Sequence, residues 1–497
     1  MYSSNGFIRS DIGDVDVVYH DGVFHLFHLV LPNHDVIAHA ISSDGMQWRR
    51  VPNAMFVGDP GCWDDDMLWT MHVTKDPASE EGWRMLYTGL QRKEAGRVQR
   101  IGAAKSDDLM NWQRVDCETH EPRPGKNEYP LAAPGKWYES SPDEGRQWVS
   151  FRDPFLFEHE GQRRLLFSAR TNQGPLIRRG CVGQAREVAP DVFEFGPPLY
   201  QPGLYDDVEV PGLYKVGDRF FLLGSIREDV KVHYWYADTP NGPFENYADN
   251  VLLPKGNYAA RCCHDGRGWL IFNFFSIGSP DDGRKNFLPP PKRLDVNPQG
   301  RLCLRSYEHF DNLEVKPAEP TDPGQYRRLF GNTYGRVELI EGGVQLSCQS
   351  GYEAFVVKST HRDFRLRCRI QLDGAGKCGL VLRIDEEANG YFLSLDLFKG
   401  VAQIRAWGAS ALAQGESAFE YRQLQAGYFV PSPGEPAELE VIAYGQYLEC
   451  SLNGYVLLTL VDERYAEGAV GFYAESASLR VQEMRIAELH EPESELF

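Results

Sequence analysis

The sequence lacks long apolar runs and shows little helical periodicity. No stretch of about 18 consecutive apolar residues occurs, so we expect no membrane-spanning helix. Basic residues are few beside acidic ones, 52 Lys and Arg against 71 Asp and Glu, which leaves a formal net charge of -19. Nucleic acids and anionic membrane surfaces both require Lys and Arg for neutralisation. We therefore expect neither as a partner.

Several chemical signatures are also missing. The chain has no glycine-rich phosphate loop ending in Gly-Lys and no Gly-x-Ser-x-Gly elbow around a nucleophilic serine. Cys262–His264 lacks the spacing of a zinc site, and ten cysteines in 497 residues do not form a disulfide framework. Met1–Gly6 carries neither basic residues nor an apolar core. These features predict a cytoplasmic protein with reduced thiols.

What recurs instead is a hairpin unit of β-favouring residues, a polar turn and a second apolar run. Five such units, separated by roughly 45–75 residues, are typical of a radial repeat of small antiparallel sheets. A short turn with a Trp follows two of them, at residues 43–48 and 106–112. The sequence thus predicts an all-β protein with a five-bladed β-propeller. The units are residues 17–27, 67–87, 155–168, 212–224 and 258–272.

The pattern of apolar and polar residues changes after a polar, proline-rich stretch near residues 316–323. Beyond it, runs such as Phe364–Ile370 and Glu438–Ile442 alternate apolar and polar residues, and Asn453-Gly454 is a hairpin-turn signal. We predict two domains, a propeller over residues 1–318 and a C-terminal β-sandwich of the concanavalin or laminin-G kind over residues 325–490.

Three acidic residues stand at the start of propeller hairpins: Asp14, Asp153 and Glu209. The first strands of propeller blades surround a central channel, so we expect these carboxyl groups to converge. Paired carboxyls suit glycoside hydrolysis, because one protonates the leaving oxygen while another attacks the sugar or activates water. Crowded like charges raise at least one carboxyl pKa. Arg152 could hold Asp153 ionised and bind sugar hydroxyls.

The motifs around these residues resemble those of glycoside hydrolase family 32 and its relatives, families 68 and 43. Arg152-Asp153-Pro154 is similar to the family's Arg-Asp-Pro motif, and Glu209–Leu213 to its Glu-Cys-Pro-Asp-Leu motif. Residues 257–260 and 288–294 are similar to its fifth-blade and exit segments. The resemblance implies that Asp14 is a nucleophile, Asp153 a transition-state stabiliser and Glu209 the general acid/base. It further implies a retaining mechanism that hydrolyses or transfers a β-fructofuranosyl unit, with no metal or organic cofactor. Because no signal peptide is visible, we expect the substrate to be a small saccharide.

The chain departs from the family in its first two blades. The opening Trp-Met-Asn-Asp-Pro-Asn-Gly motif is replaced by Ser10–Asp16, so Asp16 is a second candidate nucleophile. The segment that lines the fructose pocket is replaced by Trp63–Asp66. Here Trp63 could stack on a sugar and Asp64 could grip its hydroxyls. Two alternatives follow: an arabinofuranosidase or xylosidase of the family 43 kind, and a catalytically inactive, carbohydrate-binding propeller.

Overall fold

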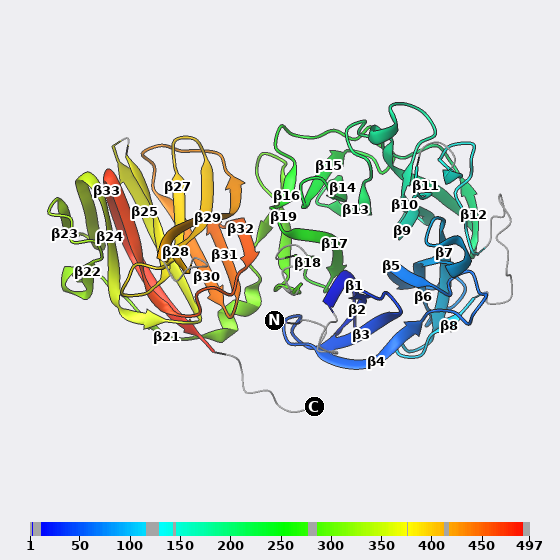
Figure 1. Cartoon of the computed structure of the whole chain (residues 1–497), viewed down its shortest axis with the longest axis horizontal. Coiled ribbons are helices and arrows are strands. Elements are labelled where there is room, and N and C mark those ends of the chain that lie inside the picture. The colour runs from blue at the N-terminus through cyan, green and yellow to red at the C-terminus, as the bar shows by residue number, and fades with distance from the viewer. Residues whose placement is uncertain are drawn as a thin grey trace. The chain divides into compact units, whose positions relative to one another are not determined.

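The computed structural model describes residues 2, 11–115, 129–142, 146–276, 286–374, 376–411 and 417–490. Strands dominate these residues (Figure 1). The helices among them are 3-10 segments of three to six residues, and none could span a membrane. The chain divides into two compact units, Met1–Leu302 and Cys303–Phe497.

The first unit contains five antiparallel sheets of four strands, each built from consecutive strands of the chain. The predicted five-bladed propeller is confirmed (Figure 1). The blades are β1 (Asp11–His20), β2 (Val23–Leu31), β3 (Val36–Ser42) and β4 (Arg49–Phe56); β5 (Met67–Lys75), β6 (Trp83–Leu90), β7 (Gln99–Ser106) and β8 (Gln113–Arg114); β9 (Phe151–His159), β10 (Gln162–Arg170), β11 (Gly180–Ala189) and β12 (Val192–Phe195); β13 (Glu209–Val216), β14 (Arg219–Ile226), β15 (Lys231–Ala237) and β16 (Val251–Leu253); and β17 (Asn257–His264), β18 (Trp269–Phe275), β19 (Lys292–Val296) and β20 (Leu302–Arg305).

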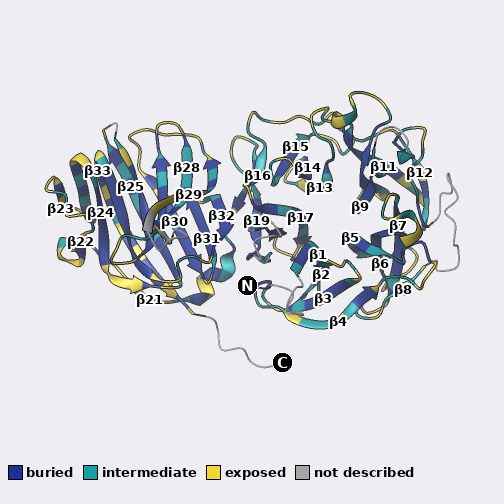
Figure 2. Cartoon of the chain, viewed as in Figure 1, coloured by how far each residue is buried: buried dark blue, intermediate teal, exposed yellow. Residues whose placement is uncertain are grey.

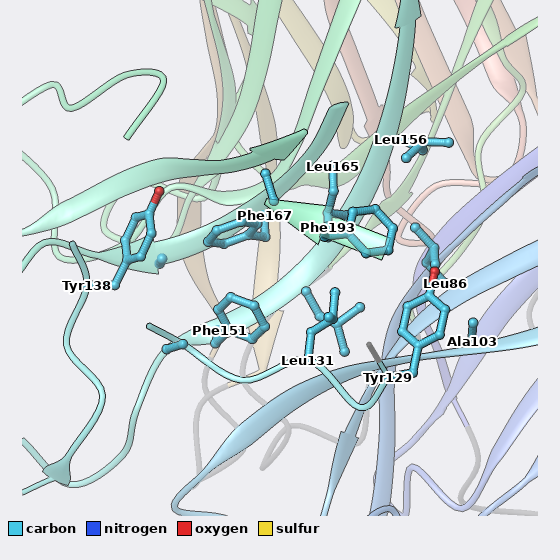
Figure 3. Close-up of a cluster of buried hydrophobic side chains, with 14 of the residues drawn as sticks. Leu86, Ala103, Tyr129, Leu131, Tyr138, Phe151, Leu156, Leu165, Phe167 and Phe193 are labelled. Atoms are coloured by element: carbon cyan, nitrogen blue, oxygen red, sulfur yellow. The ribbon is translucent and has the colours of Figure 1, made fainter. Parts of the chain in front are cut away.

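Apolar side chains fill the space between neighbouring blades. Strand β6 is buried at every position, as expected for a strand covered on both faces. One cluster joins residues of the second and third blades (Figure 3). In it the rings of Phe151 and Phe167 lie 4.6 Å apart, and both are fully buried. Both rings belong to the third blade, and Leu86 and Ala103 of the second blade pack in the same cluster. Burying one large apolar side chain is worth about 1.5–3 kcal/mol, so the cluster as a whole holds the two blades together.

Two-residue turns join the first two strands of the first, third and fourth blades. In the first blade Asp21 and Gly22 have φ of 49° and 82°, and in the third Glu160 and Gly161 have 51° and 72°. Two consecutive positive φ angles give the turn whose twist matches antiparallel strands. The Asp-Gly and Glu-Gly pairs therefore form the two-residue hairpins that the sequence indicated.

The second unit is built on one sheet of 13 strands, which folds into a nearly closed sandwich and confirms the predicted β-sandwich. Its long strands β24 and β33 pair with each other. Strand β24 also pairs with β22 and β23, and β33 with β25 and β26. Both strands carry buried and exposed residues, and β33 begins with seven buried residues in a row (Figure 2). The strands are β21 (Glu314–Ala318), β22 (Tyr326–Arg328), β23 (Gly335–Ile340), β24 (Gly343–His361), β25 (Phe364–Asp373), β26 (Lys377–Ile384), β27 (Gly390–Asp396), β28 (Val401–Ala411), β29 (Ser417–Tyr428), β30 (Ala437–Tyr444), β31 (Tyr447–Leu452), β32 (Tyr455–Val461) and β33 (Gly468–Leu489).

The division between the units falls at Leu302 and Cys303, upstream of the stretch near residue 320 that the sequence indicated. The reason is that β21 pairs with β33 of the second unit. The 3-10 segment before it, Glu308–Leu313, also belongs there, since the Phe310 ring lies 5.8 Å from that of Tyr444. The proline-rich stretch is thus an internal connection of the second unit.

Candidate active site

The first strands of all five blades contribute to one pocket of about 260 Å³, called the central pocket below. The three predicted carboxylates and Arg152 all line it, so the structure brings together four of the six predicted site residues. The lining residues are Gly13, Asp14, Leu29, Leu31, His34, Trp69, Thr70, Arg152, Asp153, Glu209, Val210, Tyr258 and Phe274.

An irregularity in strand pairing marks the pocket end of each blade. The register between first and second strands shifts beside Asp14, Thr70, Asp153, Glu209 and Tyr258. Bulges of this kind bend a strand and re-aim a side chain, and they are frequent next to active sites. Asp153 adopts a φ of 58°, in the left-handed region that non-glycine residues rarely occupy. The bulges thus turn polar side chains of apolar strands into the pocket.

Asp14 lies on β1, half-buried, and one carboxylate oxygen accepts a hydrogen bond from the Thr70 hydroxyl. Burial and the neighbouring charge of Asp153 raise the pKa of Asp14 to about 7, although the Thr70 bond opposes the shift. This carboxyl group therefore exchanges its proton close to neutral pH.

Asp153 is 2% exposed and is held by backbone as well as side-chain contacts. Its Oδ2 accepts a hydrogen bond from the Val210 N–H at 2.9 Å and lies 3.5 Å from Arg152 Nε. Its own N–H donates to Thr88 Oγ1 at 3.1 Å. Burial raises the pKa of Asp153, while the Arg152 charge acts against that rise. These contacts fix the carboxyl group in one orientation.

Both carboxylate oxygens of Glu209 accept hydrogen bonds. Arg152 Nη2 donates to Oε1 at 2.6 Å, and the Tyr258 hydroxyl donates to Oε2. Arg227 Nη1 lies 4.0 Å from Oε1. Charge-assisted bonds of this kind are short and strongly directional. The carboxyl group of Glu209 is thus positioned by three blades, through β9, β13 and β17.

Arg152 connects this pocket to a buried ion network behind it. The side chain is 6% exposed, and its Nη2 lies 3.4 Å from Asp207 Oδ2. Arg170, which is fully buried, donates to the same Asp207 oxygen at 2.7 Å. Although burial acts to raise it, Arg152 and Arg170 keep the pKa of Asp207 below its ordinary value. A buried charge is costly unless paired, so this network keeps Arg152 ionised beside Glu209.

Asp16, the second candidate nucleophile, does not line the central pocket. It is 2% exposed, and its Oδ2 accepts a hydrogen bond from the Val73 N–H at 2.6 Å. His72 Nδ1 lies 3.3 Å from the same oxygen. Since Val73 and His72 belong to β5, Asp16 joins the first blade to the second.

The prediction that Trp63 and Asp64 bind the sugar is wrong, because neither residue lines the pocket. The Trp63 ring stacks on Tyr87 at 5.5 Å and lies in the apolar core between the first two blades. Asp64 is fully buried, accepts from the Tyr87 hydroxyl at 2.9 Å and pairs with Arg114 Nε at 2.8 Å. Both residues stabilise the second blade.

Among the lining residues that the sequence did not indicate, four have a side-chain N–H or O–H group or ring nitrogen that can bond a sugar: His34, Trp69, Thr70 and Tyr258. Trp69, Thr70 and Tyr258 stand at the starts of the second and fifth hairpins, the position that singled out the carboxylates. A search restricted to acidic residues passed over them. His34, in the turn after β2, carried no sequence signal, and its ring lies 5.8 Å from that of Trp69.

Three carboxyl groups and an arginine that meet in one pocket of a five-bladed propeller suit glycoside hydrolysis. Together with the family match given next, they support a glycosidase. Residues 15–178 match the model of the glycosyl hydrolases family 32 N-terminal domain, which confirms the resemblance to this family. The match contains Arg152 and Asp153; it begins one residue after Asp14 and ends before Glu209. No curated protein matches the sequence.

Solved structures with a similar fold come from bacteria, insects and yeasts. Sucrose-6-phosphate hydrolase from Lactobacillus gasseri is 14% identical, with a TM-score of 0.67 over 96% of this chain and 91% of that one. A β-fructofuranosidase of Bombyx mori is 15% identical, with a TM-score of 0.64 over 97% and 94%. A β-fructofuranosidase from Schwanniomyces occidentalis complexed with fructosyl-erythritol is 12% identical, with a TM-score of 0.66 over 99% and 97%. At these identities the likeness shows the fold.

Proposed function

We propose that the protein hydrolyses or transfers a β-linked fructofuranosyl unit of a small saccharide at the central pocket. The observation that supports this most directly is the meeting of Asp14, Asp153 and Glu209, from three separate blades, around one pocket. The family 32 match and the β-fructofuranosidases among the similar structures support the choice of fructose.

In the first step the Asp14 carboxylate attacks the anomeric carbon of fructose, and the bond to the leaving oxygen breaks. Glu209 gives its proton to that oxygen, so the leaving sugar departs as an alcohol. In the second step the Glu209 carboxylate takes a proton from water, whose oxygen displaces Asp14 from the anomeric carbon. Two displacements at one carbon retain its configuration. Another sugar hydroxyl in place of water would give transfer.

The remaining side chains orient and stabilise the reacting groups. Asp153, rigidly held by Val210 and Arg152, would bind fructose hydroxyls and stabilise the positive charge that develops on the ring. Tyr258 and Arg152 hold Glu209 for proton transfer. Attack requires ionised Asp14, so its raised pKa sets the acid limb of activity.

The test is product analysis by NMR with sucrose, short inulin- and levan-type oligosaccharides, and aryl furanosides of fructose and arabinose. We expect β-fructofuranose as the first-formed sugar, before mutarotation, or a fructosyl-transfer product. The matched variant is Glu209→Gln, which preserves shape but carries no transferable proton. It should lose about 10²–10⁴-fold in kcat, the usual contribution of general acid catalysis, while still binding sugar.

Three outcomes would contradict the proposal. Activity confined to arabinosides would assign the pocket to another furanose. First-formed α-fructofuranose would replace the covalent step with direct attack by water. Sugar binding without turnover, unchanged in Glu209→Gln, would make the propeller a binding domain.

A further inference from the structure

Arg261, on β17, is fully buried and has no part in the reaction steps given above. Among the described residues its guanidinium donates only to backbone carbonyl oxygens. Nη2 donates to Pro154 at 2.9 Å, and Nη1 donates to Val210 at 3.3 Å and to Pro211. A buried charge is costly unless negative charge or several acceptors offset that cost. The contacts of Arg261 therefore call for a functional explanation.

The carbonyl groups that Arg261 binds lie in the two bulges beside Asp153 and Glu209. The pairing of β9 with β10 skips residues 153–154, and that of β13 with β14 skips residues 210–211. One residue in each bulge has a φ in the left-handed region, 58° in β9 and 50° in β13. A bulge leaves backbone groups without partners in the sheet, and buried carbonyl groups need donors. Arg261 supplies donors to both bulges from a third blade, and so fixes the backbone bends that aim Asp153 and Glu209.

The positive charge of Arg261 also acts on Asp14. Burial and the charge of Asp153 raise the pKa of Asp14 to about 7, and the charge of Arg261 opposes that rise. A nearby positive charge favours the carboxylate form of an acid. Arg261 does not line the central pocket, so it acts from outside the space that a bound sugar would occupy. The other titratable or charged groups around Asp14, all of which line the pocket, are His34, Arg152, Asp153, Glu209 and Tyr258.

We propose that Arg261 is a positioning residue for the reaction: its guanidinium fixes the bulges that aim Asp153 and Glu209, and its charge favours the carboxylate form of Asp14. A planar guanidinium suits this role, because its several N–H groups can reach two bulges at once while its charge is retained at every working pH. This inference rests on the proposed function for the identity of the reaction, and on the contacts of Arg261 for its part in it.

The test measures kcat and kcat/KM for sucrose between about pH 4 and about pH 9 in wild type, Arg261→Lys and Arg261→Met. Lys keeps the charge but lacks the planar fork, so we expect kcat to fall about tenfold while the acid limb of activity stays in place. Met loses both the donors and the charge. We therefore expect kcat to fall about 10²-fold and the acid limb to move up by at least about half a pH unit. Arg261→Gln, also uncharged, takes the place of Arg261→Met if that variant does not fold.

The matched control is Arg84→Met. Arg84 is also fully buried and joins two blades, through Glu187 and Asp191, but it does not line the central pocket. This variant should lose stability while its kcat and acid limb remain those of wild type. An acid limb that stays in place without the Arg261 charge, or that moves equally in Arg84→Met, would overturn the inference. Wild-type kcat in Arg261→Lys would do the same.

Urea unfolding separates failure of this inference from failure of the proposed function, because it needs no substrate. At about pH 8, Asp14→Asn should raise the free energy of unfolding more in the Arg261→Met background than in wild type, since the Asp14 carboxylate has then lost its opposing charge. This coupling, together with no turnover of any fructoside, supports the effect of Arg261 on Asp14 and refutes the reaction. Turnover of sucrose with neither coupling nor a shifted acid limb refutes the role of Arg261 and retains the reaction.

Discussion

Replacing Asp14 with Asn should make the propeller more stable at neutral pH while abolishing turnover. Burial and the charge of Asp153 raise the pKa of Asp14 from 3.8 to about 7 in the folded state. Between these values the folded chain binds more protons than the unfolded chain, so the free energy of unfolding falls as the pH rises. Asn carries no charge, and it keeps an oxygen that can accept from the Thr70 hydroxyl. The substitution therefore removes this pH-dependent fall in the free energy of unfolding.

The gain in stability expected of Asp14→Asn follows from the pKa shift of Asp14. One pKa unit corresponds to about 1.36 kcal/mol, so a rise from 3.8 to about 7 costs about 4 kcal/mol when the pH is above both values. Because Asp153 shares the titration, we expect about 2–4 kcal/mol from this single carboxyl group. Near pH 4 and below, the folded wild type is protonated at Asp14, and the two proteins should differ little.

The assay is urea unfolding at about pH 4 and about pH 8, monitored by tryptophan fluorescence. The slopes of unfolding free energy against urea concentration are compared between wild type and variant, because equal slopes show that the same transition is measured. Asp59→Asn, an exposed residue outside the central pocket, is the control and should show no pH-dependent difference. A stability difference between Asp14→Asn and wild type that is equal at both pH values would refute the reasoning. So would a variant less stable than wild type at the higher pH.

Three further substitutions test the pocket and the scaffold around it. Tyr258→Phe should lower kcat about tenfold with little change in KM, because Glu209 loses a positioning donor; steady-state kinetics with an unchanged kcat would contradict this role. Arg261→Met should lower the free energy of unfolding by about 2–4 kcal/mol in urea titrations, since the buried guanidinium donates to carbonyl oxygens of Pro154 and Val210 in two other blades. Trp63→Leu should cost about 2–4 kcal/mol through the cavity it leaves and should not alter KM; a raised KM would return this residue to the substrate site.

Much of the fold was readable from local pattern. Alternating apolar residues, glycine turns such as Asp21-Gly22, and the spacing of five hairpins predict a propeller, because each blade is a local antiparallel sheet with short connections. The start of each hairpin's first strand also predicted that Asp14, Asp153 and Glu209 converge. Local pattern could not assign β21 to the second unit, since its pairing with β33 joins residues about 170 positions apart.

The sequence by itself determined the all-β fold class, the order of the blades and the strand ends that carry the carboxyl groups, because these depend on patterns a few residues long. Only the tertiary structure decided which acidic residues face the pocket. Asp14 and Asp16 are two positions apart on one strand, yet a bulge aims the first at the pocket while the second caps the Val73 N–H of the next blade. Likewise, Trp63 and Asp64 resemble a sugar site in sequence but are buried against Tyr87. Contacts between blades, which join residues far apart in the chain, decide which of these side chains face the pocket.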